Sequence, residues 1–365
     1  MKILICTWRL THGGAERVAA LWAKGFIDQG YSVDFLVGSR SSKVSYDIPK
    51  NVGLYYETPF PDKIAVHFIP EIYKSYRIKR ILEKIKPDVV ISVLPSYGQK
   101  IIRLLNKKIP VIVTEHNSYE RPSYAPMPQI QEEQKFNTNG LFDAVTVLTQ
   151  ADKDYLINKM GEYFARNTYV MPNPLAFSPT KGLENKAKVI LAAGRMDAWH
   201  CKGFDLLINA WGRIAEKHRD WILKIAGGGN PAPILSMAKK NHIDDRISFL
   251  GFVDMLECYK DASIFVLSSR YEGFGMVLTE AMSQGCACVA CDYKGRQREI
   301  IQNENQGIVC PVDDVGALAV AIEKMIDDES YRTKCQKNAI ERSKYFALSN
   351  IMEKWNDIFR ALKLI

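Results

Sequence analysis

The stretch of residues 268–282 reads SSRYEGFGMVLTEAM, and it directly follows the apolar run Ile264–Leu267. Two glycines, Gly273 and Gly275, separate the strand predicted by this run from a helix that begins at Met276. Two glutamates lie eight positions apart, the first in the loop and the second about one turn inside the helix. A strand, a glycine-rich loop and a helix in succession form the unit of a doubly wound α/β domain, which binds ligands where such loops leave the sheet.

The rest of the chain repeats this alternation of short apolar runs and amphipathic helical stretches. Continuous runs of β-branched and apolar residues predict strands that are buried on both faces, and therefore parallel sheets covered by helices. Two series of such units predict two doubly wound, Rossmann-like α/β domains. The predicted strands are Ile3–Cys6, Val33–Val37, Val89–Val93, Val111–Thr114 and Ala144–Leu148, then Val189–Ala193, Ile222–Ala226, Ile247–Leu250, Ile264–Leu267 and Cys288–Cys291.

A break in the pattern separates the two domains. Residues 171–175 read MPNPL and cannot continue a helix, and the polar stretch 178–188 predicts a linker. We therefore expect an N-terminal domain over residues 1–172 and a C-terminal domain over 173–345. A final helix is expected within 346–365, because apolar residues recur there at helical spacing. These residues are Ile351, Trp355, Ile358, Phe359 and Leu362.

Composition is that of a soluble globular protein. Of 365 residues, 47% are hydrophobic and 25% charged, and no apolar run reaches the roughly 18 residues that a membrane span needs. The net charge of +8 suits anionic partners, namely nucleic acid, nucleotide phosphates or an acidic membrane surface. The eight cysteines have no disulfide-framework spacing, as expected for reduced thiols in a cytoplasm. Polar residues follow Ile3–Cys6 at once, so this run predicts a core strand and not a signal peptide.

Two more glycine-containing loops favour phosphate binding. Residues 11–18 read THGGAERV, and a glycine pair before a helix presents backbone N–H groups to phosphate. Residues 194–197 read GRMD, and Arg195 and Lys202 flank this loop at the carboxyl end of a predicted strand. Both cations would stabilise a diphosphate leaving group as its negative charge grows. Each motif alone also fits a tight turn or solvated surface cations. The G-x-G-x-x-G motif is absent, which argues against a dinucleotide-binding fold.

Together these motifs resemble those of glycosyltransferase family 4, a large family of retaining enzymes with the two-domain GT-B fold. Glu272 and Glu280 match the family's Glu-x7-Glu signature. The resemblance implies two doubly wound domains that face each other across a cleft, and a C-terminal helix that crosses back to the N-terminal domain. The other matches, in the family's order, are Gly13-Gly14-Ala15-Glu16, Thr114-Glu115-His116, Asn173-Pro174, Gly194-Arg195 with Lys202-Gly203, Ala226-Gly227-Gly228-Gly229 and Phe249–Val253.

The resemblance also implies roles for single residues. Arg195 and Lys202 would hold the donor diphosphate, and Glu280 would bind the ribose. Glu272 would contact the donor sugar, and His116 would lie near the reacting sugar. The remaining donor-binding positions would be Gly13, Gly14, Gly227, Val253, Phe274, Gly275 and Met276. One segment departs from the family, since residues 291–299 read CDYKGRQRE, with three extra cations in place of a Pro- or Gly-rich turn.

The implied reaction moves a hexose or N-acetylhexosamine from a nucleotide diphosphate, with UDP expected and GDP left open, to a glycan acceptor. The acceptor would bind the N-terminal domain. The segment VISVL at 90–94 and the Thr-Glu-His motif are similar to enzymes that extend lipid-linked oligosaccharides or surface polysaccharides. The family needs no metal, and the sequence has no Asp-x-Asp motif. Cys286, Cys288 and Cys291 have no matching histidine, so we expect no metal or cofactor.

Two other functions fit the same motifs, a GT-B sugar-nucleotide epimerase and a nucleotide-sugar-binding protein without turnover. The presence of both glutamates together with Arg195, Lys202 and His116 favours an active enzyme. We expect a nucleotide-sugar donor and a lipid-linked or free glycan acceptor as partners, and no nucleic acid.

The stretch 63–86 predicts a helix that contacts an anionic membrane surface. Aromatic and apolar residues recur at helical spacing from Phe68 to Tyr76, and a second stripe runs from Ile78 to Ile85. We therefore expect a cytoplasmic enzyme that binds peripherally at the inner face of the plasma membrane. An ordinary scaffold helix, or one that grips a lipid diphosphate acceptor, remains an alternative. The seven cations are Lys63, Lys74, Arg77, Lys79, Arg80, Lys84 and Lys86, against the two acids Glu71 and Glu83.

Overall fold

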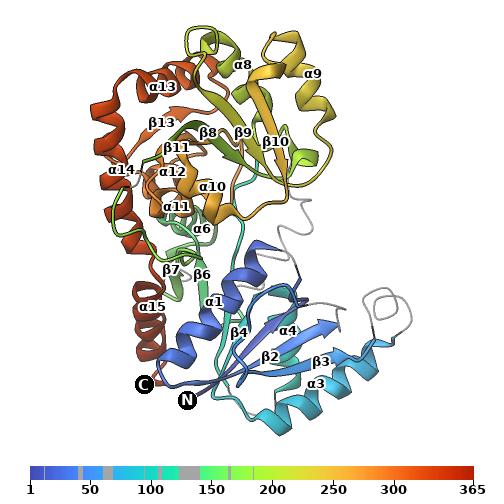
Figure 1. The fold of residues 1–365 in the computed structure, drawn as a ribbon. Coiled ribbons are helices and arrows are strands. Elements are labelled where there is room, and N and C mark those ends of the chain that lie inside the picture. The colour runs from blue at the N-terminus through green and yellow to red at the C-terminus, as the bar shows by residue number, and fades with distance from the viewer. Residues whose placement is uncertain are drawn as a thin grey trace. The chain divides into compact units, whose positions relative to one another are not determined.

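The computed structural model describes residues 1–11, 13–39, 44–60, 69–93, 95–105, 109–122, 140–162, 166–183 and 185–365. The chain divides into two compact units. Residues Met1–Pro174 and Leu348–Ile365 form the first unit, and Leu175–Ala347 form the second. Each unit is a parallel sheet with helices on its faces (Figure 1), so the predicted pair of Rossmann-like α/β units is confirmed.

The first unit is built on a seven-stranded sheet in the order β3-β2-β1-β4-β5-β6-β7. All six strand pairings are parallel, and β1 lies next to both β2 and β4. Its strands are β1 (Lys2–Thr7), β2 (Ser32–Ser39), β3 (Gly53–Thr58), β4 (Val89–Ser92), β5 (Val111–Thr114), β6 (Ala144–Val147) and β7 (Thr168–Val170). Its helices are α1 (Gly14–Asp28), α3 (Glu71–Ile85), α4 (Pro95–Leu104), α6 (Gln150–Met160) and the C-terminal α15 (Leu348–Ala361).

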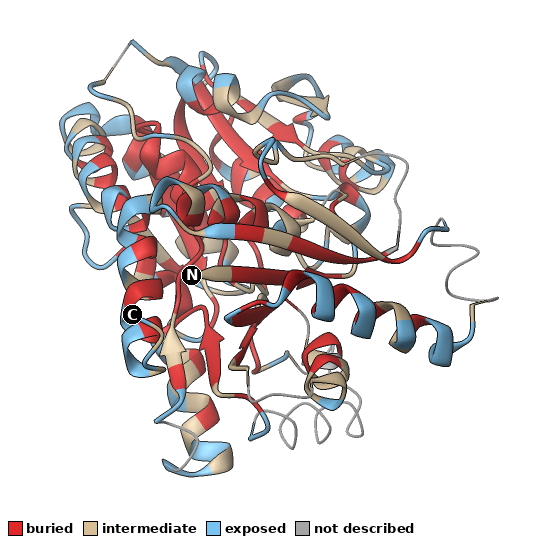
Figure 2. Ribbon diagram, turned by 90° about the horizontal axis from the view of Figure 1, so that it is seen from below, coloured by how far each residue is buried: buried red, intermediate tan, exposed pale blue. Residues whose placement is uncertain are grey.

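The second unit has a six-stranded parallel sheet in the order β10-β9-β8-β11-β12-β13. Its strands are β8 (Ala187–Ala193), β9 (Ile222–Ala226), β10 (Ile247–Gly251), β11 (Ala262–Leu267), β12 (Ala287–Asp292) and β13 (Ile308–Pro311). Its helices are α8 (Phe204–Ile214), α9 (Ala232–Lys240), α10 (Met255–Asp261), α11 (Met276–Ser283), α12 (Arg296–Ile300), α13 (Val315–Asp327) and α14 (Glu329–Ser343). Figure 2 shows the usual consequence of this layering, with buried central strands and with many helices that have a buried and an exposed face.

All ten predicted strands are present, whereas β3, β7 and β13 were not predicted. These three are the edge strands of the two sheets, and β10 is the fourth edge. An edge strand is covered on fewer sides, so its residues are mixed in character: β3 reads GLYYET and β13 ends in a proline. A search for continuous apolar runs therefore finds the central strands and misses three of the four edges.

The C-terminal helix α15 packs against α1 through aromatic side chains. The Trp355 ring meets Trp22 edge-on at 5.1 Å and Phe26 at 5.5 Å, and the Phe359 ring lies 5.7 Å from Phe26. The two helices can approach because α1 has a glycine at the contact. A Cβ atom added at Gly25 would lie 2.5 Å from Met352 Sδ.

No helix in the described part of the chain is both long enough and apolar enough to cross a membrane. All eight cysteines carry free thiols. The thiols of Cys286 and Cys288 are buried along the start of β12, and this burial raises the pKa of the Cys286 thiol to about 11.

We expect Gly25→Ala to destabilise the protein by about 1–2 kcal/mol, because the new methyl group overpacks the contact with Met352. The matched control is Gly316→Ala in α13, where a Cβ would meet other atoms only at 3.4 Å. The control should gain about 0.5–1 kcal/mol from helix propensity. Urea unfolding followed by tryptophan fluorescence measures both, and equal gains for the two variants would contradict the close packing.

Candidate active site

The centre of the second sheet is a topological switch point. From β8 the chain proceeds through β9 to β10 on one side, and from β11 through β12 to β13 on the other. The loops that follow β8 and β11 therefore leave adjacent strands in opposite directions, which opens a ligand site at the carboxyl ends. The quoted stretch 268–282 is the loop after β11 together with α11, as predicted.

An ion pair joins these two loops. Lys202 Nζ donates a hydrogen bond to Glu272 Oε1 over 2.7 Å, and Ser269 Oγ donates to the same oxygen over 2.7 Å. Burial alone would lower the pKa of Lys202, but the adjacent Glu272 carboxylate outweighs that effect and raises it. Lys202 therefore stays a cation at neutral pH. The hydrogen bond shows that Lys202 and Glu272, which the sequence assigned to one site, are in contact.

Further hydrogen bonds hold the same loops together. Ser268 Oγ donates to the carbonyl of Lys202 over 2.9 Å, and the backbone N–H of Arg270 donates to Cys201 over 2.9 Å. The Arg270 guanidinium binds both carboxylate oxygens of Asp205 over 2.7 Å and one oxygen of Asp313 over 2.6 Å. These carboxylates, Asp205 first, raise the pKa of Arg270.

The sequence pattern did not predict these ion pairs of Arg270, although Arg270 lies within residues 268–282. A largely buried arginine needs carboxylate partners, but its partners follow β8 and β13 and cannot be found from sequence spacing.

Arg195 lies at the start of the loop after β8. Its charge acts on Lys202, whose pKa it lowers slightly against the larger effect of Glu272. The Arg195 side chain is exposed, and none of the ion pairs found within the described residues involves it. Two cations therefore gather at the switch point, and only one has a carboxylate partner there.

Gly227 brings the loops after β8 and β9 into direct contact. Its φ is 135°, and an added Cβ would lie 2.0 Å from the carbonyl oxygen of Gly194. Its N–H donates to the carbonyl of Gly251 over 2.8 Å, which ties in the loop after β10. Val253, one of the expected donor-binding residues, follows in that loop and is 40% exposed.

Helix α11 contains the second glutamate of the signature. Gly275 precedes the helix, Met276 begins it, and the Phe274 side chain is buried. Glu280 is only 2% exposed, and its Oε2 accepts a hydrogen bond from the Tyr259 hydroxyl over 3.1 Å. This carboxylate therefore lies inside the unit, held by α10.

The first unit places its predicted residues at the carboxyl ends of β1 and β5. The N–H of Gly13 was expected to be free for phosphate, but it donates to the Tyr46 hydroxyl over 2.6 Å. Gly14 begins α1 and is exposed. His116 Nε2 lies 2.9 Å from Thr114 Oγ1, and burial lowers the pKa of the imidazole to about 4.

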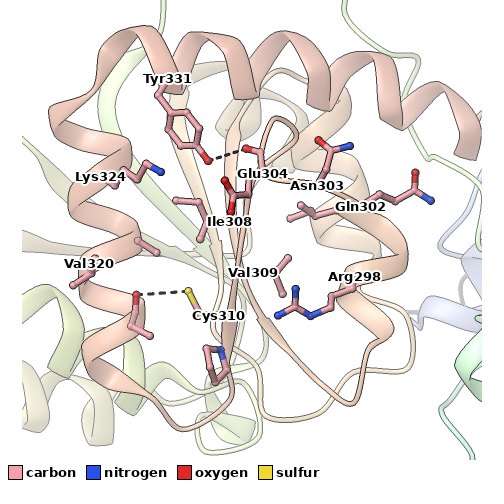
Figure 3. Close-up of a pocket in the computed structure, with 15 residues that line it drawn as sticks. Arg298, Gln302, Asn303, Glu304, Ile308, Val309, Cys310, Val320, Lys324 and Tyr331 are labelled. Carbon is pink, nitrogen blue, oxygen red and sulfur yellow. Dashed lines mark hydrogen bonds between the residues drawn. The ribbon is translucent and has the colours of Figure 1, made fainter.

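Other clusters lie apart from these residues. His218 lies 3.5 Å from Glu323 and 3.7 Å from Asp327, but Lys217 also binds Glu323 over 3.1 Å. A cavity of about 590 Å³ borders β13 and contains no predicted site residue (Figure 3). Of the three extra cations after β12, the Arg296 side chain is buried and Arg298 binds Asp292 over 3.0 Å.

We expect Gly227→Ala to destabilise the second unit by about 3 kcal/mol or more, because a side chain is strained at this φ and its Cβ would collide with Gly194. Gly182→Ala is the control, since nothing lies within 4 Å of an added Cβ there. Thermal unfolding of both variants is the measurement. A Gly227→Ala midpoint equal to that of the control would show that the loops are not in contact.

Comparison with known proteins identifies the family of this chain. A family model described as "Glycosyltransferase Family 4" matches residues 12–176, and one described as "Glycosyl transferases group 1" matches 176–342. An α-1,4-N-acetyl-D-galactosaminyltransferase of Campylobacter jejuni, named for a diNAcBac-PP-undecaprenol-linked substrate, is 26% identical over 100% of this chain and 99% of its own. The amylovoran biosynthesis glycosyltransferase AmsD of Erwinia amylovora is 26% identical over 95% of each chain.

A solved structure of Anabaena Alr3699/HepE with UDP and glucose has a TM-score of 0.80 and 18% identity, and it covers 99% of this chain and 100% of that chain. The two family models meet at residue 176, close to the boundary between the two units. The expected family, GT-B fold and enzyme class are therefore confirmed. The chain belongs to glycosyltransferase family 4 and is a glycosyltransferase with the GT-B fold.

Proposed function

We propose that this enzyme transfers a hexose or N-acetylhexosamine from a UDP-sugar, with retention of the α configuration, to a lipid-linked glycan in polysaccharide or oligosaccharide assembly. The names of two relatives support the acceptor class. One acts on an undecaprenol-diphosphate-linked substrate, and the other serves amylovoran biosynthesis. UDP in the Anabaena structure supports the choice of nucleotide.

The observation that carries the proposal is the meeting of Lys202, Glu272 and the close-packed Gly227 loop at the switch point. A diphosphate bound there would lie against Lys202 and Arg195. Both cations stabilise the leaving group most strongly when the glycosidic bond breaks and negative charge accumulates on the phosphate.

The Lys202–Glu272 pair gives the site a way to respond to the donor. Before the donor binds, the carboxylate neutralises the buried ammonium. As the diphosphate arrives it competes for Lys202, and Glu272 becomes available to accept hydrogen bonds from hydroxyl groups of the donor sugar. Ser269 keeps the carboxylate oriented during this exchange.

The remaining assignments follow the family motifs. Glu280 would bind the ribose, the loops at Gly227 and Val253 would border the base, and Phe274 to Met276 would present backbone to the sugar. Gly13 and Gly14 would admit the donor phosphates, which requires the Tyr46 hydroxyl to give up the Gly13 N–H. His116 would lie near the reacting sugar as a neutral imidazole, and no metal would be needed.

We expect Lys202→Ala or Arg195→Ala to lower turnover by about a hundredfold, as loss of one preorganised charge does. Lys188→Ala is the control, because this exposed β8 lysine pairs with Asp220.

Glu280→Gln should raise the donor KM more than it lowers kcat, because ribose contacts are equal in the ground and transition states.

Initial rates and NMR of the product linkage test these points together. Near-normal rates for both cation variants would refute the diphosphate assignment. A β linkage, or activity abolished by EDTA, would refute the retaining, metal-independent reaction. Epimerisation of the donor without transfer to any acceptor would favour a sugar-nucleotide epimerase, and binding of the donor without any turnover would favour a nucleotide-sugar-binding protein.

We also propose that α3 binds an anionic membrane surface, although one of the expected cations is turned inward. The helix begins at Glu71, after Pro70, and Lys63 to Phe68 of the expected stretch lie outside the described residues. Lys74, expected on the basic face, is buried and pairs with Glu71 over 3.0 Å, while Arg77 donates to the Tyr56 carbonyl. The surface presents Ile72 and Tyr76 of the expected aromatic stripe, which are 82% and 61% exposed. The exposed cations of this helix and its end are Lys79, Arg80, Lys84 and Lys86.

This arrangement supports an interfacial helix, since apolar and aromatic side chains would enter the headgroup layer beside cations worth about 1 kcal/mol each. A Lys79→Ser/Arg80→Ser variant should lose most binding to phosphatidylglycerol vesicles in co-sedimentation. The control removes two exposed lysines from α9, Lys239→Ser/Lys240→Ser, and should bind as wild type. Equal binding by both variants, or no effect of high salt, would leave α3 as scaffold.

A further inference from the structure

Three aromatic rings from separate elements contact one another in the first unit. His116 follows β5, Trp22 lies on α1, and Trp355 lies on α15. The Trp22 ring centroid is 5.5 Å from that of His116 and 5.1 Å from that of Trp355. Trp22 and Trp355 are 1% and 0% exposed. The imidazole is thus backed by an indole that cannot move without disturbing the packing of two helices.

The contacts of Thr114 bear on where the imidazole proton lies. Thr114 Oγ1 lies 3.4 Å from the carbonyl oxygen of Ser92 and 2.9 Å from His116 Nε2. A hydroxyl group has one hydrogen, so while Thr114 donates to Ser92 it accepts from an Nε2–H group of His116. Burial lowers the pKa of His116 to about 4, which keeps the ring neutral at physiological pH. In this arrangement the neutral ring carries its proton on Nε2 and a lone pair on Nδ1.

Two buried polar atoms on these neighbouring rings lack partners. Within the described residues, neither His116 Nδ1 nor the Trp22 indole nitrogen Nε1 has a hydrogen-bond partner. In the Nε2–H tautomer, His116 Nδ1 is an acceptor, whereas the indole N–H of Trp22 can only donate. The two unmet groups are complementary, and they belong to rings already in contact.

We propose that Trp22 is a positioning residue for His116, a role that rests on the proposed function of His116 near the reacting sugar. Its indole N–H bonds to His116 Nδ1 through one buried water, which satisfies both groups and holds the imidazole in the Nε2–H tautomer. With Nδ1 secured in this way, Nε2–H is free to exchange its bond from Thr114 to a hydroxyl group of the bound substrate. Trp22 thereby sets the direction in which His116 presents its proton.

The test removes the indole N–H together with part of the bicyclic ring, and its control loses the same volume. Trp22→Phe keeps an aromatic ring, and we expect kcat to fall about tenfold or more with KM within twofold, because misplacement of a reacting-site group is costly. Trp355→Phe is the matched control: it also removes a buried, unpartnered indole N–H, one ring further from His116. It should leave kcat and KM unchanged. Equal kcat losses in the two variants would overturn the proposal.

Nitrogen-15 NMR of the histidine rings provides a readout that does not depend on activity. The wild-type His116 resonances should report the Nε2–H tautomer, and Trp22→Phe should shift them towards a mixture of tautomers while Trp355→Phe does not. An Nδ1–H tautomer in the wild type would overturn the proposal. If His116→Ala keeps full kcat, the proposed role of His116 fails, and the NMR comparison still decides whether Trp22 holds its tautomer.

Discussion

The hydrogen-bonded ion pair between Lys202 and Glu272 is the interaction on which the site of the second unit depends. It closes the gap between loops that leave β8 and β11 in opposite directions. Ser269 binds the same carboxylate oxygen, and the guanidinium of Arg270 holds the loop by binding Asp205. The carboxylate is therefore oriented by both loops before any ligand arrives.

The first unit uses a polar network to fix its helices, and this network explains why Lys74, an expected surface cation of α3, is buried. Glu57, at the end of β3, accepts a hydrogen bond from Tyr97 over 2.6 Å and one from Lys100. Lys100 also binds Glu71 on the first turn of α3 over 2.8 Å, and the pKa of Glu71 falls mainly because of Lys100. Since Glu71 also holds Lys74, that lysine turns inward and leaves the exposed surface to Ile72 and Tyr76.

Local pattern was sufficient for the central strands and for the loop that contains Glu272, because burial on both faces leaves an unbroken apolar run. It was insufficient wherever a residue's environment depends on a distant partner. Arg270 is held by Asp205 and Asp313, and Gly13 meets a tyrosine 33 positions away. Family motifs carried the site assignment further than periodicity did, but they named Glu280 without indicating that its carboxylate would be buried against Tyr259.

A donor diphosphate that binds at the switch point, as proposed, must compete with Glu272 for Lys202. A crystal structure of the protein with UDP tests this most directly. We expect phosphate oxygens within hydrogen-bonding distance of Lys202 Nζ, and a Lys202–Glu272 separation longer than the present 2.7 Å. UDP bound with its phosphates away from Lys202, and the ion pair unchanged, would contradict it.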